Sequence, residues 1–219
     1  MSTIYSEDCR NAMQRPLSYD YVLTSPPDFD ELGMVPQRDK GVYFDFLGEC
    51  FALLNPDVPV TVVNTDRKSG GLIIPKHSII TTLLHRRGYA LCSQKIWVKS
   101  FKQNLYRLNY AFVQTFARGS AKVNRFDDAF GKDAWHIQCP KYSGYSYNFP
   151  PDLARRCIRN HTDEGAVVFD PFIGSGTTAV AALDEGRAFL GCEIDPVTHQ
   201  LALARIAAHE GRESGARRV

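Results

Sequence analysis

The fold is decided by residues 167–195, which read VVFDPFIGSGTTAVAALDEGRAFLGCEID. The apolar run 167–169 predicts a strand, and the glycines that follow it predict a turn. Residues 177–185 have the composition of a helix, and Gly186 after them is a natural helix stop. Residues 188–192 form a second apolar run. This order predicts a strand, a turn, a helix and a second strand.

The glycine turn has the features of a nucleoside-cofactor site. Gly174 and Gly176 can adopt backbone angles that are closed to other residues, so a ligand can approach the main chain there. The unpaired N–H groups at the start of the following helix favour an anionic group. Glu193 follows the second strand, close to the offset at which an acidic side chain accepts hydrogen bonds from ribose hydroxyls.

The glycine spacing alone leaves the identity of the cofactor open. The pattern Gly174-x-Gly176-x-x-Ala179 also satisfies the dinucleotide fingerprint of a nicotinamide oxidoreductase. A dinucleotide fold needs a second mononucleotide half after its first βαβ unit, and only residues 196–219 follow here. A phosphate-binding P-loop is excluded because no lysine follows the glycines. The setting therefore favours another adenosine cofactor.

The segment DPFIGSGTT, residues 170–178, resembles the S-adenosylmethionine motif of DNA amino-methyltransferases with the permuted order, in which the cofactor half comes last. The resemblance implies S-adenosylmethionine as the cofactor. Together with the strand ends that a doubly wound sheet brings to one crevice, it indicates these cofactor-binding residues: Asp8, Asn148, Phe149, Asp170, Pro171, Phe172, Gly174, Ser175, Gly176, Thr177, Thr178, Glu193 and Asp195.

A second informative motif lies near the amino end of the chain. The β-prone run 19–24 stops at SPPDF, residues 25–29, which we call the acceptor tip. Two consecutive prolines donate no backbone hydrogen bond and hold the chain extended, which leaves the carbonyl groups of the tip free. Two prolines can also simply end a strand. However, TSPP at residues 24–27 resembles the catalytic loop of the same family, and both motifs occur in the order of that family.

The resemblance implies a reaction and a set of catalytic residues. An exocyclic amino group is a poor nucleophile because its lone pair is delocalised into the base. The Ser25 hydroxyl and the Pro26 carbonyl could accept its two N–H bonds and localise the lone pair for direct attack on the sulfonium methyl group. The Pro-Cys dipeptide that C5-cytosine enzymes use is absent from the sequence. The catalytic candidates are Ser25, Pro26, Pro27, Asp28 and Phe29.

The position after the two prolines departs from the family, which usually has Tyr or Phe there. This chain has Asp28, and Phe29 follows it. An amino group inside a duplex is reached only by flipping the base out, and an aromatic side chain beside the loop should then stack on it. Either Phe29 takes over this stacking, or Asp28 contacts the base or helps to remove the proton from its nitrogen.

Serine at the first position of the tip favours cytosine N4 as the target, because the adenine enzymes of the family usually carry Asp or Asn there. Two further functions stay open: adenine N6 methylation of DNA, and a module that binds the cofactor and nucleic acid without activity. The resemblance also implies DNA as a partner. A homodimer is a further expectation, since such enzymes often dimerise.

Strands alternate with helices along the chain, which is typical of an α/β fold. The resemblance implies a single Rossmann-like methyltransferase domain over residues 1–219, with a mostly parallel seven-stranded sheet flanked by helices in circularly permuted order. We expect a catalytic half at 1–117, a small target-recognition insert at about 118–147 and a cofactor half at 148–210. The expected strands are 2–5, 19–24, 59–63, 91–98, 111–116, 167–169 and 188–192, and the expected helices include 43–54, 75–87, 177–185 and 196–208, before a frayed basic tail at 211–219.

The insert is irregular and rich in aromatic residues, with basic residues near it. These suit base stacking and phosphate contact, although each basic cluster can also be a solvated surface and Trp135 can equally pack on the sheet. The aromatic residues are Phe126, Phe130, Trp135, Tyr142, Tyr145 and Tyr147. The basic clusters are Lys95, Lys99, Lys102 and Arg107; Arg118, Lys122 and Arg125; and Arg155, Arg156 and Arg159.

Composition places the chain among globular proteins. It has 219 residues, of which 44% are hydrophobic and 23% charged, and its formal net charge is only +2. No apolar run approaches the length of a membrane span, and the amino end lacks the features of a signal peptide, so we expect a cytoplasmic protein of prokaryotic or phage origin. The six cysteines and six histidines lack metal-ligand spacing, so we expect no metal.

Overall fold

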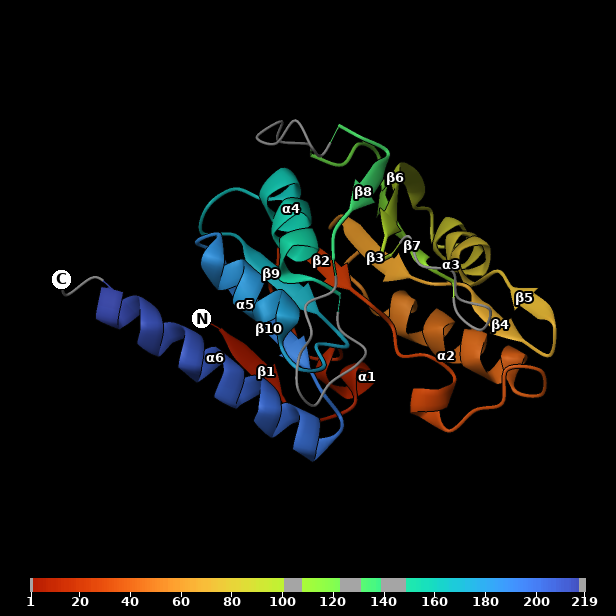
Figure 1. Cartoon of the computed structure of the whole chain (residues 1–219), viewed down its shortest axis with the longest axis horizontal. Helices are drawn as coiled ribbons and strands as arrows, with labels where there is room; N and C mark the ends of the chain where they lie inside the picture. The colour runs from red at the N-terminus through yellow and green to blue at the C-terminus, as the bar shows by residue number, and fades with distance from the viewer. Residues whose placement is uncertain (1, 101–107, 123–130, 139–148, 217–219) are drawn as a thin grey trace.

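The computed structural model describes residues 2–100, 108–122, 131–138 and 149–216. Its centre is a sheet in the order β1, β10, β9, β2, β3, β7, β6 and β8 (Figure 1). The first five of these strands run parallel: β1 (Thr3–Tyr5), β10 (Ala188–Cys192), β9 (Val167–Asp170), β2 (Tyr21–Thr24) and β3 (Val60–Asn64). β7 (Tyr110–Ala117) is antiparallel to β3 and to β6 (Ala90–Val98), and β8 (Ala134–His136) is parallel to β6.

The central strands are buried on both faces because helices cover both sides of the sheet. Successive side chains of a strand point to opposite faces. In β2, Tyr21 and Leu23 therefore join one hydrophobic core, and Val22 joins the other. All five residues of β3 are buried. Burial along the whole strand is what a parallel sheet covered on both faces produces.

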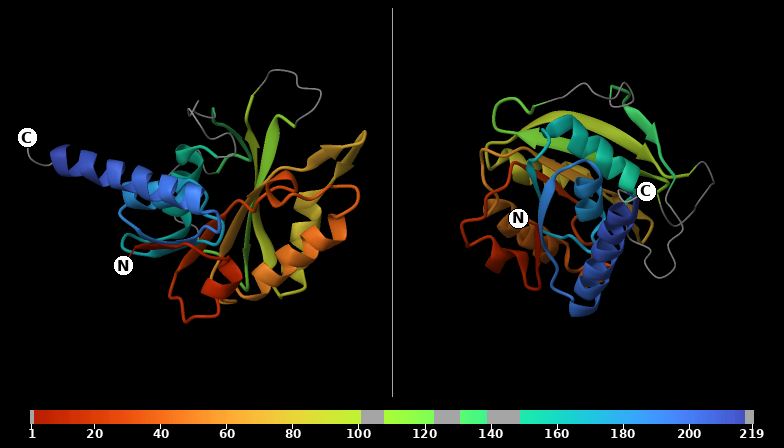
Figure 2. Two further views of the ribbon diagram at one scale, coloured as in Figure 1. Left: turned by 90° about the horizontal axis from the view of Figure 1, so that it is seen from below. Right: turned by 90° about the vertical axis from the view of Figure 1, so that its left-hand side faces the viewer.

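The two faces are covered by helices from different parts of the chain (Figure 2). The helices α1 (Cys9–Ala12), α2 (Lys40–Ala52) and α3 (Lys76–His85) pack on one core. The helices α4 (Pro151–His161), α5 (Thr177–Asp184) and α6 (Pro196–Ala216) pack on the other. α4 begins with a proline, whose fixed backbone angle suits a first turn, and its buried residues include Leu153, Ala154, Cys157 and Ile158.

Two small elements lie beside the sheet. A short 3-10 helix, η1 (Asp30–Leu32), follows the acceptor tip. The strands β4 (Arg67–Ser69) and β5 (Leu72–Ile74) form a separate antiparallel hairpin between β3 and α3. The hairpin projects from the body of the molecule (Figure 2).

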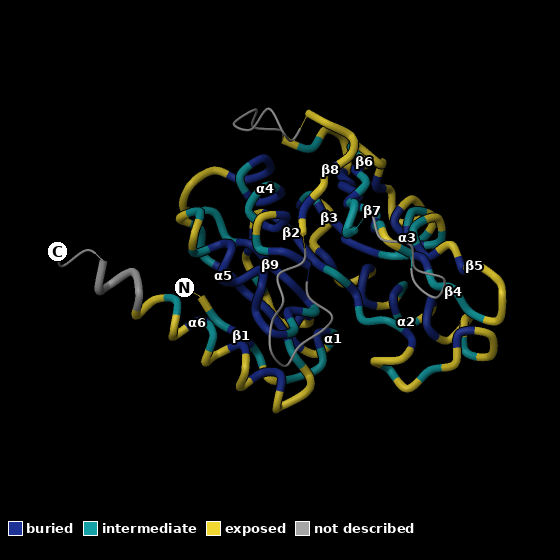
Figure 3. Tube along the Cα trace, in the orientation of Figure 1, coloured by how far each residue is buried: buried dark blue, intermediate teal, exposed yellow. Residues whose placement is uncertain are grey.

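The α/β fold with a mostly parallel sheet is confirmed, but two details of the expectation are wrong. Within the described residues the sheet has eight strands rather than seven, because β8 forms inside the segment expected to be irregular and pairs with β6. The last helix, α6, continues to Ala216, into the segment expected to be a frayed tail, and much of its outer side is exposed as far as Gly211 (Figure 3). In the described residues, no helix is long and apolar enough to cross a membrane.

Candidate functional site

A cavity of about 700 Å³ opens where β1, β10, β9 and β2 end. The carboxyl ends of parallel strands meet at one edge of a sheet, and ligands of open α/β sheets bind there. The cavity is therefore lined by segments that are far apart in sequence. Its lining consists of Glu7, Asp8, Cys9, Arg10, Ser25, Pro27, Glu31, Leu32, Met34, Phe46, Phe149, Asp170, Pro171, Phe172, Ile173, Gly174, Thr177, Cys192, Glu193, Ile194, Asp195 and Thr198.

The two predicted motifs meet in this cavity because their strands are neighbours. β2 precedes the acceptor tip, β9 precedes the glycine turn, and these two strands pair in parallel through Tyr21–Val168 and Val22–Phe169. Ser25 and Gly174 consequently line the same cavity. The two motifs come from opposite ends of the chain, and the sheet brings them side by side.

The two glycines of the turn have different surroundings. Gly174 has a φ of +54°, and a Cβ built on it meets no atom closer than 4.0 Å, so its main chain faces open space at the cavity. Gly176 has a φ of +82° and stands at the start of α5, where a Cβ would lie 3.4 Å from the Ala202 side chain of α6. Gly174 thus exposes backbone to a ligand, whereas Gly176 permits close packing of α5 against α6.

Asp170 connects the two motifs through its carboxylate. Its Oδ1 accepts hydrogen bonds from the Thr24 hydroxyl at 2.7 Å and from the Phe172 N–H at 3.0 Å, and its Oδ2 accepts one from the Thr178 hydroxyl at 2.6 Å. Burial raises the pKa of Asp170 to about 6, although these hydrogen bonds lower it. Thr24 directly precedes the acceptor tip, so this carboxylate fixes the tip relative to the glycine turn.

Acidic side chains stand at the ends of two further strands. Glu193 follows β10 and lines the cavity, and burial raises the pKa of its carboxyl group. Its Oε1 accepts the N–H of Asp195 at 2.8 Å. Asp8 follows β1 and caps α1 by accepting the N–H of Arg10 at 2.8 Å, and the Arg10 side chain lowers the pKa of Asp8. All three acids were expected here, and all three line the cavity.

The remaining cofactor candidates divide into lining and supporting residues. Phe149, Pro171, Phe172 and Thr177 line the cavity. Ser175 is buried, and its hydroxyl lies 3.2 Å from Nη1 of Arg205, which also contacts the Thr177 hydroxyl at 3.0 Å. The Thr178 hydroxyl donates its hydrogen bond to the Asp170 carboxylate. Asn148 lies outside the described residues.

The residues of the acceptor tip differ in their burial and in their access to the cavity. Ser25 is partly exposed and Pro27 also lines the cavity, while Pro26 is buried. The carbonyl oxygen of Pro27 accepts a hydrogen bond from the Tyr43 hydroxyl at 2.8 Å. This contact ties the tip to α2. Ser25 is therefore the tip residue with a polar side chain on the cavity.

Phe29 and Asp28 both contact other residues of the protein. The Phe29 ring is fully buried and stacks on Tyr43, with ring centroids 4.1 Å apart, so it presents no exposed face to a base. The Asp28 carboxylate is held by Lys76 at 3.2 Å and by Arg67 at 3.4 Å. Neither residue is part of the cavity lining described above.

Sequence reasoning missed several lining residues from other elements. Phe46 lies on α2 outside the apolar face formed by Phe44, Leu47 and Phe51, and an aromatic residue off the buried face of a helix is a signal that could have identified it. Ile194 stands between Glu193 and Asp195 and is 65% exposed. A large apolar residue between two acids at a strand end is a second such signal.

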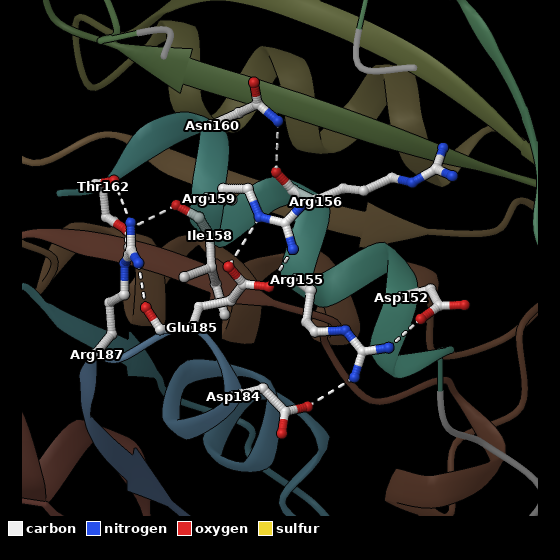
Figure 4. Close-up of polar contacts among 10 residues, drawn as sticks. All are labelled: Asp152, Arg155, Arg156, Ile158, Arg159, Asn160, Thr162, Asp184, Glu185 and Arg187. Atoms are coloured by element: carbon white, nitrogen blue, oxygen red, sulfur yellow. Dashed lines mark hydrogen bonds and ion pairs between the residues drawn. The ribbon is translucent and has the colours of Figure 1, made fainter. Parts of the chain in front are cut away.

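Several described residues of the basic clusters contact other residues of the protein. Arg155 pairs with Asp152 and Asp184, and Arg159 pairs with Glu185, so these arginines join α4 to the end of α5 (Figure 4). Lys95 pairs with Asp133, Lys122 with Asp163, and Arg118 donates to the Arg87 carbonyl. The Arg156 guanidinium lies 5.7 Å from the ring centroid of Trp135.

Of the aromatic residues expected to stack on bases, the structure describes Trp135. Its side chain is buried, and its indole N–H donates to the Lys132 carbonyl at 3.0 Å. Trp135 thus packs on the sheet. The other aromatic residues, Phe126, Phe130, Tyr142, Tyr145 and Tyr147, lie outside the described residues, as do Lys102, Arg107 and Arg125. Among the residues that the structure covers, no group of His, Cys, Asp and Glu could hold a metal ion.

Parts of the sequence are similar to known DNA methyltransferases. Residues 98–204 match the N6/N4 methyltransferase family described as DNA methylase. Over 119 residues the chain is 35% identical to the type II methyltransferase M.XycI of Xanthomonas campestris pv. cyanopsidis. That alignment covers 54% of this chain and 37% of the relative, so the chain spans little more than a third of that protein.

Solved structures match almost the whole chain. A putative DNA modification methylase from Thermus thermophilus, solved with S-adenosyl-L-methionine, has a TM-score of 0.77 and 25% identity over 95% of this chain and 94% of that one. The cytosine-N4-specific PvuII DNA methyltransferase has a TM-score of 0.75 and 17% identity over 96% of this chain and 92% of that one. The chain has the α/β fold of S-adenosylmethionine-dependent methyltransferases.

Proposed function

We propose that this chain is an S-adenosylmethionine-dependent DNA amino-methyltransferase that acts on cytosine N4. The observation that carries the proposal is the shared cavity of Ser25 and Gly174. A methyltransferase needs a donor site and an acceptor site in one space, and here the motif expected for each lies on the same cavity. The DNA methylase family match over residues 98–204 supports the same class of reaction.

The cavity fits an adenosine cofactor in size and in chemistry. Its volume of about 700 Å³ lies within the range of pockets that take small ligands. Gly174 leaves main chain accessible, the N–H groups at the start of α5 favour the carboxylate end of a ligand, and Glu193 suits ribose hydroxyls. When bound, S-adenosylmethionine supplies an electrophilic methyl group on its sulfonium.

At the acceptor end, the Ser25 hydroxyl accepts an N–H of the exocyclic amino group, and the carbonyl of Pro26 is proposed to accept the second. Two acceptors aimed at these hydrogens localise the nitrogen lone pair toward the methyl group. The N–C bond forms as the bond between sulfur and the methyl group breaks, the thioether S-adenosylhomocysteine leaves, and the methylated nitrogen releases one proton to solvent. The base must leave the duplex stack to reach the cavity. Serine at this position is the reason to propose cytosine N4 before adenine N6.

We further propose that residues 1–219 form one methyltransferase domain of the permuted class. Residues 1–117 would supply the acceptor half, 118–147 a small recognition insert and 148–210 the cofactor half. The late position of the glycine turn, after β9, and the early position of the tip, after β2, support this order. DNA is the proposed substrate, and a homodimer is the proposed assembly.

Nucleoside mass analysis tests the proposal. DNA is incubated with the protein and isotope-labelled S-adenosylmethionine and then digested to nucleosides. We expect labelled N4-methylcytosine. Labelled N6-methyladenine would overturn the base assignment but keep the class of reaction. Binding of S-adenosylmethionine without any methylated nucleoside would instead indicate a non-catalytic module, and a melting temperature raised by NAD but not by S-adenosylmethionine would indicate an oxidoreductase.

A further inference from the structure

The end of the acceptor tip is held by an ion cluster whose members are not part of the cavity lining. The Asp28 carboxylate is bound by two cations: Nζ of Lys76 lies 3.2 Å from its Oδ1, and Nη1 of Arg67 lies 3.4 Å from its Oδ2. The same Oδ1 accepts the N–H of Phe29 at 2.8 Å. We call Asp28, Lys76 and Arg67 the tip anchor.

The burial of Lys76 indicates that its ion pair with Asp28 is part of the folded structure and not a chance surface contact. The Lys76 side chain is only 4% exposed, and lysine is almost never buried without an ionic partner. Its ammonium group also lies 5.4 Å from the centre of the Tyr43 ring. Asp28 supplies the negative charge that a buried ammonium requires.

The tip anchor links the tip to a different part of the fold. Lys76 is the first residue of α3 and Arg67 the first residue of β4, and they stand 48 and 39 residues from Asp28 in sequence. Arg67 also binds Asp30 of η1 at 2.5 Å. The Tyr43 hydroxyl fixes the Pro27 carbonyl from α2. The tip is therefore held from α2, α3 and β4 at once.

We propose that Asp28, Lys76 and Arg67 are positioning residues, which set the geometry of the Ser25 and Pro26 acceptors by fixing the end of the tip. The inference rests on the proposed methyl transfer. It explains why an acid stands where the resemblance predicts an aromatic ring: Asp28 acts through the position of the tip and does not stack on the base. A small displacement of reacting groups costs up to about a hundred-fold in rate, so loosening this anchor should slow turnover.

The test compares single and double neutral variants of the anchor. Asp28→Asn leaves the buried Lys76 ammonium without its carboxylate, whereas Lys76→Met leaves the partly exposed Asp28 with Arg67 alone. Both should lower the melting temperature, and Asp28→Asn should lower it more. The double variant Asp28→Asn/Lys76→Met removes both charges and should recover much of the stability, since a neutral pair can replace a buried ion pair. We expect the double variant to keep a kcat roughly ten-fold or more below wild type, with an unchanged Kd for S-adenosylmethionine.

Two exposed residues of α2 provide matched controls. Asp45→Asn and Lys40→Met make the same chemical changes at exposed positions and should leave both kcat and melting temperature unchanged. A double variant that regains stability and also the kcat of the wild type would overturn the inference, because the ion pair would then serve only stability. A wild-type chain that binds S-adenosylmethionine but methylates no DNA would overturn the proposed function, and this inference with it.

Discussion

The carboxylate of Asp170 joins three elements at the centre of the molecule. Its partners are Thr24 at the end of β2, Thr178 in α5 and the backbone of Phe172 in the glycine turn. Three donors around one buried carboxylate offset part of the cost of its burial. The net effect is a pKa raised from 3.8 to about 6, which makes the stability of the protein depend on pH in a defined direction.

Replacing Asp170 by Asn should reveal this pH dependence. A carboxyl group whose pKa is raised in the folded state stabilises fully below its unfolded pKa, and this contribution is lost as the pH rises through about 6. Asn does not titrate. Relative to wild type, the unfolding free energy of Asp170→Asn should therefore rise by on the order of 3 kcal/mol between pH 4 and pH 7. Urea unfolding at several pH values measures this difference, and a difference that stays constant with pH contradicts the assignment.

Gly174 offers a second prediction at the scale of one residue. Gly174→Ala places a methyl group at the cavity and strains a backbone with a φ of +54°. We expect the Kd for S-adenosylmethionine to rise roughly ten-fold or more, about 1.4 kcal/mol, as measured by calorimetry.

Gly165→Ala is the matched control for Gly174→Ala. Gly165 also has a positive φ, +81°, and a Cβ there would meet no atom within 4 Å. It precedes β9 and is outside the cavity lining. Both variants should lose about 1 to 2 kcal/mol of stability through backbone strain, but Gly165→Ala should keep the affinity for the cofactor. Equal loss of affinity in both variants would show that Gly174 acts through stability alone.

At this scale, the sequence predicts which residues lie at the strand ends that form the cavity. Gly174, Glu193 and Ser25 stand where their motifs suggested, because a strand end and its following turn are neighbours in sequence. The surroundings of Asp28 and Phe29 could not be predicted. Their partners Lys76, Arg67 and Tyr43 come from other elements, and no local pattern indicates which cation will meet Asp28.

At the scale of elements, α4 and α5 are joined by ion pairs rather than only by apolar packing. Arg159 makes a two-point contact with Glu185, with N–O distances of 2.8 and 2.5 Å, and Glu185 is only 10% exposed. Arg187 donates to the Thr162 hydroxyl and carbonyl on the same side (Figure 4). A cluster of arginines that suggested a phosphate surface therefore serves, in part, to fix two helices to each other.

Arg159→Gln separates these two roles. If the arginine holds α4 to α5, the variant should lose about 1 kcal/mol of unfolding free energy, and its affinity for DNA should keep the salt dependence of the wild type. If Arg159 instead binds a phosphate, the slope of the logarithm of affinity against the logarithm of salt concentration should fall by about one. Titrations of labelled duplex at several salt concentrations measure this slope.

Most elements follow from the sequence, and the exceptions have physical causes. β10 has the expected bounds, and β1 forms at the edge of the sheet within the expected range 2–5. β8 was missed because three residues in a polar segment carry little local preference for a strand, and its formation depends on pairing with the distant β6. The end of α6 was placed too early, because the low helix propensity of Gly211 does not stop this helix.

At the scale of the whole molecule, the order of the strands determines where chemistry can occur. β9 lies next to β2. The last third of the chain therefore meets the first thirty residues at the carboxyl ends of these central strands. The resemblance predicted this neighbourhood, but hydrophobic periodicity alone could not, since it indicates strands without indicating their order. The cavity is the consequence of that pairing, and the central claim is that its two motifs act on a single pair of substrates.

The turnover of Ser25→Ala, measured together with its affinity for S-adenosylmethionine, tests this claim most directly. Removing the hydroxyl should lower kcat for DNA methylation about a hundred-fold or more, the scale of losing one acceptor or donor aimed at the reacting group, while the Kd for the cofactor stays that of wild type. Ser78→Ala, at an exposed position of α3, should change neither quantity. A Ser25→Ala protein that methylates DNA at the wild-type rate, or that loses the cofactor instead, would contradict the account.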